Sequence, residues 1–207
     1  YDLVDASGKV LVRDKALLSL KDYKLRERLA DLAEAGITSF KIEGRLKNES
    51  YVRNVVRDYS IALDELVARC PETYERGSYG QVSGGFTPDT AKTFNRGYTE
   101  LYIDGKRGKW ASMDAAKSMG EEIGQVVSLN KDKSSVGLKL VRKDIVLNNG
   151  DGFSFVGKDS SVNGFRGDVC SGNSIRCKST PSLYVGAKIF RNINIAFEKE
   201  IERKACT

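Results

Sequence analysis

Three ionisable side chains stand at alternate positions around one glycine and could handle an anionic substrate. Lys41, Glu43 and Arg45 flank Gly44 at the end of an apolar run that starts at Ile37. Two cations can neutralise a phosphate or an acidic co-substrate, and the carboxylate can orient the guanidinium or a substrate hydroxyl. If the run is a strand, Lys41 and Glu43 share one face near its C-terminal end, where barrel enzymes keep their chemistry. These three residues are the candidate catalytic group.

An ordinary surface turn explains the same three residues. In that alternative Glu43 and Arg45 form an exposed ion pair of the kind that many proteins carry without any chemical role. The residue types alone leave both interpretations open.

A second candidate group lies around Arg96, in a run that holds an aromatic residue, an amide and a glycine. Arg96 could present its planar fork of donors to a phosphate or carboxylate, with Asn95 beside it. The alternative is a tight turn in which Asn95 or Gly97 is left-handed and Arg96 points into solvent. Lys117 could contact a nucleic-acid backbone, although a solvated loop lysine is the simpler interpretation. Asn95, Arg96 and Lys117 are the candidate RNA- or substrate-binding residues.

The composition argues against several classes of enzyme. The chain has no histidine, which removes the usual general base and the commonest metal ligand. Its four cysteines form no C-x-x-C pair, and Cys170 and Cys177, seven residues apart, make no zinc or iron–sulfur site by themselves. We therefore expect reduced structural or surface thiols, no metal site, and no self-contained hydrolase.

The elements that must position the first group read as helix, strand, helix. Apolar residues at helical spacing predict a helix over 22–35, which Gly36 ends. A strand over 37–42 follows, and Asn48 or Ser50 can cap a second helix whose apolar stripe runs from Val52 to Val67. This pattern is typical of one terminal unit of a parallel α/β architecture. A parallel strand needs neighbours, which must come from outside this sequence or from a partner.

The later part of the chain follows a different pattern. A glycine-rich stretch over 77–88 predicts a domain boundary, and short β-runs follow it, with turns at 149–152 and at Asn163-Gly164. The runs lie over 123–129, 135–141, 152–156, 174–177 and 184–190, after an opening strand pair at 3–4 and 10–12. We expect a small antiparallel β-barrel, because closure removes exposed strand edges. The segment 195–204 could be a last strand or a short helix, and Gly150-Asp151-Gly152 reads as a plain turn.

Charge and hydropathy set the class of protein. The 207 residues carry a net charge of +6, and residues 71–207 hold 21 basic and 16 acidic groups. That bias favours RNA contact only slightly. No run approaches the roughly 20 apolar residues of a membrane span, so we expect a cytoplasmic protein with no membrane partner. The first residue is Tyr1 and the chain enters mid-pattern, which suggests an excised part of something longer.

Several motifs taken in series resemble the C-terminal half of the collagenase-like peptidase family U32. They are Ser39-Phe40-Lys41-Ile42-Glu43-Gly44-Arg45 with Tyr51-Val52, Phe94-Asn95-Arg96-Gly97-Tyr98-Thr99, Lys117-Ser118-Met119-Gly120-Glu121 and Gly150-Asp151-Gly152. The resemblance covers nearly the whole chain. It implies that residues 1–79 are the C-terminal part of a barrel-like α/β catalytic domain and that residues 80–207 are a β-rich extension domain. The fold class expected is therefore α/β plus all-β.

Family members carry two kinds of function, proteolysis and hydroxylation of RNA bases or a quinone precursor with an iron–sulfur cluster. A cluster needs about four thiolates, and none of Cys70, Cys170, Cys177 or Cys206 matches a family ligand position. We expect no cofactor in this chain, a cluster in the full-length protein, and little activity without the missing N-terminal barrel portion.

The preferred hypothesis is a part of an rRNA- or tRNA-hydroxylating member whose β-domain helps to position RNA, with no DNA specificity. The alternatives are a true peptidase, in which Glu43 would act as base or metal ligand with partners outside this chain, and a non-catalytic binding or scaffold module.

Overall fold

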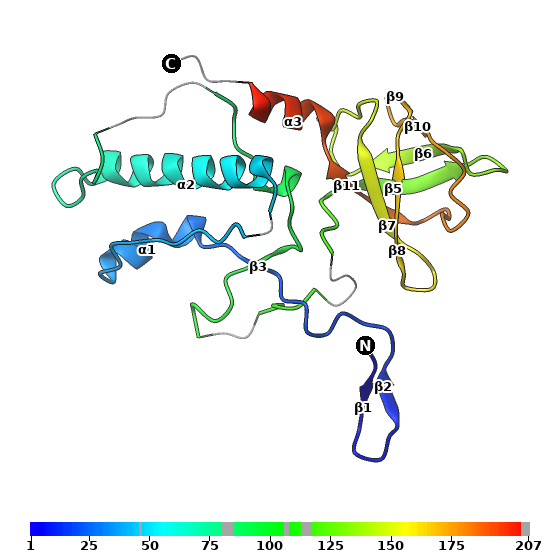
Figure 1. Ribbon diagram of the computed structural model, residues 1–207, viewed down its shortest axis with the longest axis horizontal. Helices are drawn as coiled ribbons and strands as arrows, with labels where there is room; N and C mark the ends of the chain where they lie inside the picture. Colours follow the sequence, from blue (N-terminus) through cyan, green and yellow to red (C-terminus); the bar gives the residue numbers. More distant parts are fainter. Residues whose placement is uncertain (46, 80–84, 106–107, 113–116, 204–207) are drawn as a thin grey trace.

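The computed structural model describes residues 1–207 except 46, 80–84, 106–107, 113–116 and 204–207. Figure 1 shows a small hairpin at the N-terminus, a helical part, and a curled sheet with one helix leading away from it. Among the described residues no helix is long and apolar enough to cross a membrane.

The first two strands form the expected hairpin. β1 (Leu3–Val4) pairs antiparallel with β2 (Val10–Val12), and Gly8 turns the chain with a φ of 82°. The hairpin projects from the rest of the molecule in Figure 1, and both residues of β1 are exposed. The prediction of a short strand pair is confirmed.

The helix expected over 22–35 forms only in its second half. The chain first makes β3 (Asp22–Tyr23), then a 3-10 turn, η1 (Arg26–Arg28), and α1 (Leu29–Glu34). Gly36 ends α1 with a φ of 89°, as predicted. β3 pairs in parallel with β4 (Tyr98–Thr99), so the start of the predicted helix is held by a distant part of the chain instead.

The predicted strand over 37–42 is wrong. None of the described strands pairs with this segment, and without a ladder partner its backbone has no strand hydrogen bonds. The expected alternation of faces holds only in the second half of the run, since Phe40 and Ile42 are half-buried whereas Lys41 and Glu43 are exposed. Thr38, expected on the buried face, is exposed like Ile37 and Ser39.

The second helix, α2 (Glu49–Arg69), begins where the sequence predicted. The Asn48 side chain caps it by accepting a hydrogen bond from the Tyr51 amide at 3.0 Å. Its buried face differs from the expected apolar stripe, because Asn54 and Asp58 are buried among Val55, Ala62 and Leu66 while Val52 and Val56 are exposed.

Seven antiparallel strands make up the main sheet, in the order β8-β7-β11-β5-β6-β10-β9. The strands are β5 (Glu121–Leu129), β6 (Ser135–Leu140), β7 (Gly152–Val156), β8 (Val162–Arg166), β9 (Val169–Ser171), β10 (Ser174–Arg176) and β11 (Lys188–Ile193). The two edge strands, β8 and β9, are joined by Gly167 and Asp168 alone, so the sheet must curl until its edges meet at that corner. The predicted small antiparallel barrel is thus present as a curled half-barrel.

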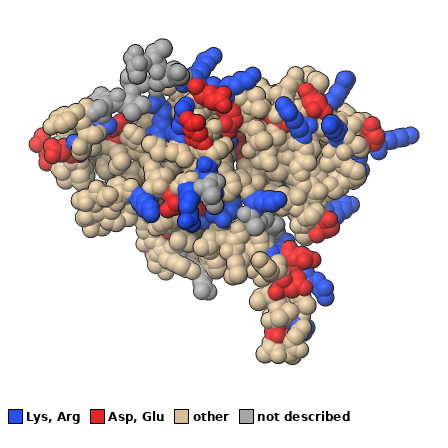
Figure 2. Space-filling model, in the orientation of Figure 1, with Lys and Arg blue, Asp and Glu red and all other residues tan. Residues whose placement is uncertain are grey.

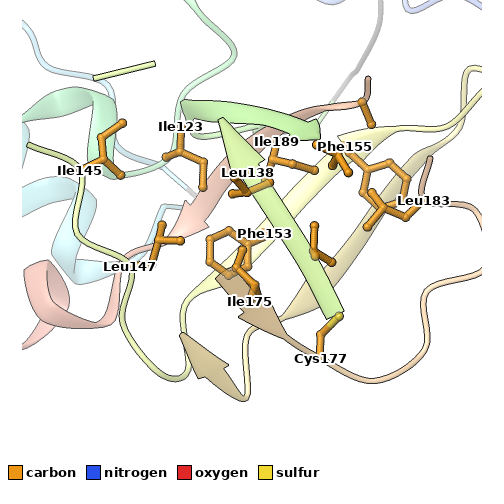
Figure 3. Close-up of a cluster of buried hydrophobic side chains, with 13 residues drawn as sticks. Ile123, Leu138, Ile145, Leu147, Phe153, Phe155, Ile175, Cys177, Leu183 and Ile189 are labelled. Carbon is orange, nitrogen blue, oxygen red and sulfur yellow. The ribbon is translucent and has the colours of Figure 1, made fainter. Parts of the chain in front are cut away.

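The core of this sheet is a cluster of buried apolar side chains. Side chains from β5, β6, β7, β10 and β11 point into one space in Figure 3, where Ile145 and Leu147 of the β6–β7 connection join them. Phe155, Ile175 and Leu183 have no exposed surface at all. Close packing of large apolar groups is what lets a sheet of this size stand alone.

Two turn predictions have different outcomes. Gly150 is left-handed, as a turn requires, but Asn163 and Gly164 lie inside β8 rather than in a turn, and the chain reverses at Asp159 and Ser160. Gly164 pairs with Ser154 in the ladder. A Cβ atom at this position would lie 3.4 Å from the Phe153 carbonyl oxygen, an ordinary contact distance, so the position is compatible with a regular strand.

Asp151 is more than part of a plain turn. It is completely buried, and its carboxylate accepts hydrogen bonds from the amides of Asn148 and Ile195 and from the guanidinium of Arg191. Arg191, 4% exposed at its side chain, also donates to Glu121 at 2.8 Å. This buried cluster ties β7, β11, β5 and the start of the last helix together.

The last segment is a helix, α3 (Ile195–Glu202), one of the two forms predicted. Phe197 packs edge-on against Phe86 with 5.9 Å between ring centroids, and the Ser50 hydroxyl at the start of α2 donates to Glu198. α3 therefore connects the sheet with the helical part, as Figure 1 shows. Contacts also cross the predicted division at residues 79 and 80, because Asn54 binds Asp89 in both directions. That division stays a prediction.

Candidate functional site

Lys41, Glu43 and Arg45 lie on the surface of the described structure. The side chain of Lys41 is 87% exposed and that of Glu43 is 69% exposed, and the two form an ion pair at 3.5 Å. The turn alternative placed the ion pair between Glu43 and Arg45, whereas in the structure Glu43 pairs with Lys41. An exposed pair of this kind contributes little to stability. Their catalytic role stays a prediction.

Lys47 follows the Lys41, Glu43 and Arg45 group in sequence and contacts the segment of the second group, which holds Asn95 and Arg96. Its ammonium lies over the ring of Phe94, 3.3 Å from the centroid, and 6.0 Å from the centroid of Tyr51. The two rings meet edge-on at 6.5 Å. Gly44 thus lies against Val52 of α2, and Lys47 lies against the segment that holds Asn95 and Arg96.

Arg96 is fixed rather than free in solvent. Its guanidinium donates to Asp22 at 2.8 Å, and its backbone amide donates to the other oxygen of the same carboxylate at 2.8 Å. Gly97 has a φ of 78°, so the turn alternative was right about the left-handed residue and wrong about the arginine. The Nε atom of Arg96 is buried and has no hydrogen-bond partner among the described residues.

Asn95 is buried and holds the turn together. Its side-chain amide donates to the carbonyls of Ala91 and Thr93, both at 3.0 Å, and its carbonyl oxygen accepts from the Gly97 amide at 3.2 Å. The side chain is therefore occupied by the backbone around it, and we infer that Asn95 positions Arg96 instead of reaching a substrate itself.

Lys117 is exposed, but its neighbour joins the same group. The Ser118 hydroxyl accepts a hydrogen bond from the Asn95 amide at 3.1 Å, which brings the start of the 117–120 segment beside the Arg96 turn. The structure therefore gathers Lys47, Arg96 and the Lys117 segment, three parts of the chain that are far apart in sequence.

The electrostatic environment perturbs Lys47. Burial is the main cause that lowers its pKa below the usual lysine value, and Arg96 lowers it further, while Asp22 acts in the opposite direction. Nearby, burial raises the pKa of Tyr98, whose hydroxyl donates to the Thr90 carbonyl at 2.6 Å. Tyr98 is therefore a neutral donor at physiological pH.

Sequence reasoning missed Lys47 and Asp22, the two residues that make this site a unit. Lys47 follows the charged run by two positions and Asp22 stands in a predicted helix, so neither the spacing nor the residue type distinguished them from solvated side chains. Only the contact between distant segments identifies them. Asp22 lies in a strand that pairs in parallel with β4, and no local sequence pattern predicts this pairing.

The described cysteines do not fit a metal cluster. Among the residues that the structure describes, no three His, Cys, Asp or Glu side chains come close enough to hold a metal ion. Burial raises the pKa of Cys170 to about 11 and also raises that of Cys177, so neither thiol is activated by its surroundings. Cys70 is exposed, and Cys206 lies outside the described residues.

The sequence matches the model of Peptidase family U32 over residues 1–112. The chain belongs to this family. The U32 match takes in both candidate groups as far as Arg96, so the surface around Lys47 lies wholly within the family region. No solved structure matches the chain.

Three U32 relatives show how varied the named activities are. The 23S rRNA 5-hydroxycytidine C2501 synthase of Escherichia coli strain K12 is 37% identical over 174 residues, which cover 82% of this chain and 25% of that protein. The tRNA hydroxylation protein P1 of Bacillus subtilis strain 168 is 30% identical over 125 residues, 59% of this chain and 28% of that protein. A collagenase of Porphyromonas gingivalis is 32% identical over 111 residues, 53% of this chain and 29% of that protein. The chain thus spans less than a third of each relative.

Proposed function

We propose that this chain is part of a U32 enzyme that hydroxylates a base in rRNA or tRNA, and that its fixed cations help to hold the RNA. The observation that carries the proposal is the extent of the likeness. The similarity to the rRNA hydroxycytidine synthase covers 82% of this chain, and with 174 residues it must take in much of the curled sheet, whereas the similarity to the collagenase covers 53%.

The charge distribution supports contact through a few phosphates rather than through a broad basic surface. Figure 2 shows Lys and Arg side chains intermixed with Asp and Glu over the face that it draws. RNA affinity would then depend on individual cations such as Arg96 and Lys117, together with Lys41 and Arg45 of the first candidate group. Glu43, paired with Lys41, would orient a cation or a substrate hydroxyl.

An iron–sulfur cluster that supports hydroxylation would lie outside the described residues. No three His, Cys, Asp or Glu side chains among the described residues lie close enough to hold a metal ion, so an iron–sulfur cluster would take its ligands from other parts of the protein. The residues described here would bind and orient RNA beside that centre, and the curled sheet would extend the contact surface.

A modification assay in cells tests the activity. In a strain without the gene, the rRNA and tRNA are digested to nucleosides, and hydroxylated nucleosides are measured by mass spectrometry after complementation with the wild type or a variant. We expect the wild type to restore one hydroxylated nucleoside and Glu43→Gln with Arg45→Met to restore much less. Lys9→Met, an exposed lysine in the projecting hairpin, is the matched control and should restore it fully.

The proteolytic alternative gives the opposite result. The likeness to the collagenase favours testing it, although the chain has no histidine and its two described sheet cysteines are protonated. Cleavage of denatured collagen by the purified intact protein, together with unchanged nucleosides in the deletion strain, would refute RNA hydroxylation. RNA binding without either activity would indicate the non-catalytic binding module.

A further inference from the structure

The ammonium of Lys47 is unusual among the lysines that lie over aromatic rings. Each of the described lysines of this kind sits within about 6 Å of a ring centroid, a normal cation–π distance. They are Lys24 over Tyr98, Lys47 over Phe94, Lys92 over Phe197 and Lys158 over Tyr184. Lys47 lies closest to its ring, at 3.3 Å.

The difference lies in the charge partners. Lys24 has Asp58 at 3.6 Å and Lys92 has Asp89 at 3.4 Å, whereas Lys158 is exposed to solvent. Lys47 is half-buried, and no carboxylate among the described residues lies within 4 Å of it. The carboxylate of Asp22 attracts Lys47 from beyond that distance, but it is already hydrogen-bonded to Arg96, so the two cations share one counter-charge. A partly desolvated cation that is only partly neutralised is costly unless something anionic joins it.

A second cation lies at the same ring. The Arg96 guanidinium is 5.9 Å from the Phe94 centroid, and Asp22 accepts hydrogen bonds from only one of its terminal nitrogens and from its backbone amide. Its Nε is buried and has no partner in the part of the chain that the structure describes. Asp22 therefore fixes the direction of Arg96 while leaving donors of the guanidinium fork unused.

The start of α2 adds to the positive potential. The helix begins at Glu49, two residues after Lys47, and over its 21 residues it carries a dipole whose positive end is here. The carboxylate of Glu49 pairs with Arg53 and not with Lys47. Two cations and a helix N-terminus thus converge on one aromatic ring, and Asp22 is the neutralising group that the described residues supply.

We propose that Lys47 and Arg96, held on the ring of Phe94 at the N-terminus of α2, form an oxyanion subsite that binds one backbone phosphate of the RNA. The inference rests on the proposed RNA function for the identity of its occupant. It adds Lys47 as a substrate-binding residue and makes Asn95 and Asp22 the positioning residues for Arg96. A phosphate suits the pair chemically, because ammonium and guanidinium groups both donate charge-assisted hydrogen bonds to its oxygens.

Protection of Lys47 from acylation tests the subsite directly. The intact protein is treated with a limiting amount of an acetylating reagent, and the modification of each lysine is measured by peptide mass spectrometry with and without inorganic pyrophosphate or a short single-stranded RNA. Both ligands should slow modification of Lys47 several-fold and leave Lys92 unchanged. Lys92 is the internal control because it also lies on a phenylalanine ring but already has a carboxylate. Equal effects on the two lysines would overturn the proposal.

The salt dependence of RNA binding tests the occupant. Lys47→Met keeps an unbranched side chain on Phe94 and removes the charge, and Lys92→Met is the matched variant. For a single strand the log–log slope of affinity against salt should become shallower by about 0.7 in Lys47→Met, the value for one phosphate. It should not change in Lys92→Met. If circular dichroism shows that Lys47→Met is folded and its slope is unchanged, the proposed contact between Lys47 and a phosphate is refuted.

The two measurements separate this inference from the proposed function. A wild-type protein that binds no RNA, but whose Lys47 is protected by pyrophosphate, would refute the RNA function and keep the oxyanion subsite. A steep salt dependence without protection of Lys47 would keep the RNA function and refute the subsite.

Discussion

The curled sheet and the helical part are stabilised in different ways. The sheet encloses an apolar cluster that includes Phe153, Phe155 and Ile175, and its buried charges are paired with one another. The helical part buries polar residues such as Asn54 and Asp58 and leaves Val52 and Val56 exposed. The comparison indicates that the sheet supplies a stable support, whereas the helical part depends on specific polar contacts between distant segments.

The largest effect should come from opening the sheet core. Phe155→Ala removes a fully buried ring that also contacts Phe165, and we expect the free energy of unfolding to fall by about 3–5 kcal/mol. Val127→Ala, at a half-exposed position of β5, should cost far less. Urea unfolding followed by circular dichroism measures both, and similar losses in the two variants would mean that the cluster is not the main support of the sheet.

The buried charges of the sheet should give the next effect. Arg191→Met leaves Glu121 and Asp151 without their shared cation, and breaking a buried pair on one side costs roughly 3 kcal/mol or more. Arg142→Met removes the other cation that touches Glu121, but Arg142 is half-exposed and its loss should cost under about 1 kcal/mol. Thermal unfolding ranks the two variants. Equal melting temperatures would contradict the role given to Arg191.

How far the sequence predicts the structure also differs between the two regions. In the sheet, β-runs bounded by turn residues located β5, β6, β7 and β10 nearly to the residue. β8 was missed because Asn163-Gly164 is a typical turn pair. Here both residues lie inside the strand, where Gly164 faces the Phe153 carbonyl at an ordinary contact distance. Local pattern was sufficient for β5 and β6, which pair with each other, but not for β8 and β9, although each of these also pairs with a strand next to it in sequence.

In the helical part, local pattern was a poorer guide. The run 37–42 has strand-like alternation but no partner, and Asp22 begins a parallel pairing with residues 76 positions away in the chain. The site inherits the same difficulty. Arg96 and Lys117 could be nominated by residue type, whereas Lys47 and Asp22 matter only because the fold brings distant segments together. Such contacts leave no periodic trace in the sequence.

Releasing Arg96 should have a moderate effect that is confined to the helical part. Asp22→Asn keeps the shape of the side chain and weakens two charge-assisted hydrogen bonds, so we expect a loss of about 1–2 kcal/mol. RNA affinity should fall as well, because the guanidinium is no longer held in one direction. Glu100→Gln removes a partner of Arg28 at a more exposed position and serves as the control. Unchanged stability and RNA binding in Asp22→Asn would mean that Asp22 does not position Arg96.

The smallest expected effect is a change in how stability varies with pH. The pKa of Lys47 is lowered in the folded protein, chiefly by burial and further by Arg96, so between the lowered value and the unfolded value of 10.5 the unfolded chain binds more protons than the native one. The contribution of Lys47 to the free energy of unfolding should therefore rise with pH through that window. It should fall correspondingly when the pH is lowered through the same window. The nearby Tyr51 and Tyr98 have raised pKa values and act in the opposite direction above pH 10, so the wild type must be compared with Lys47→Met at each pH. Urea unfolding from pH 7 to 10 should show the wild type gaining stability relative to the variant. A difference that stays constant over this range would mean that the Phe94 ring and Arg96 leave the Lys47 ammonium as well solvated as one on the open surface.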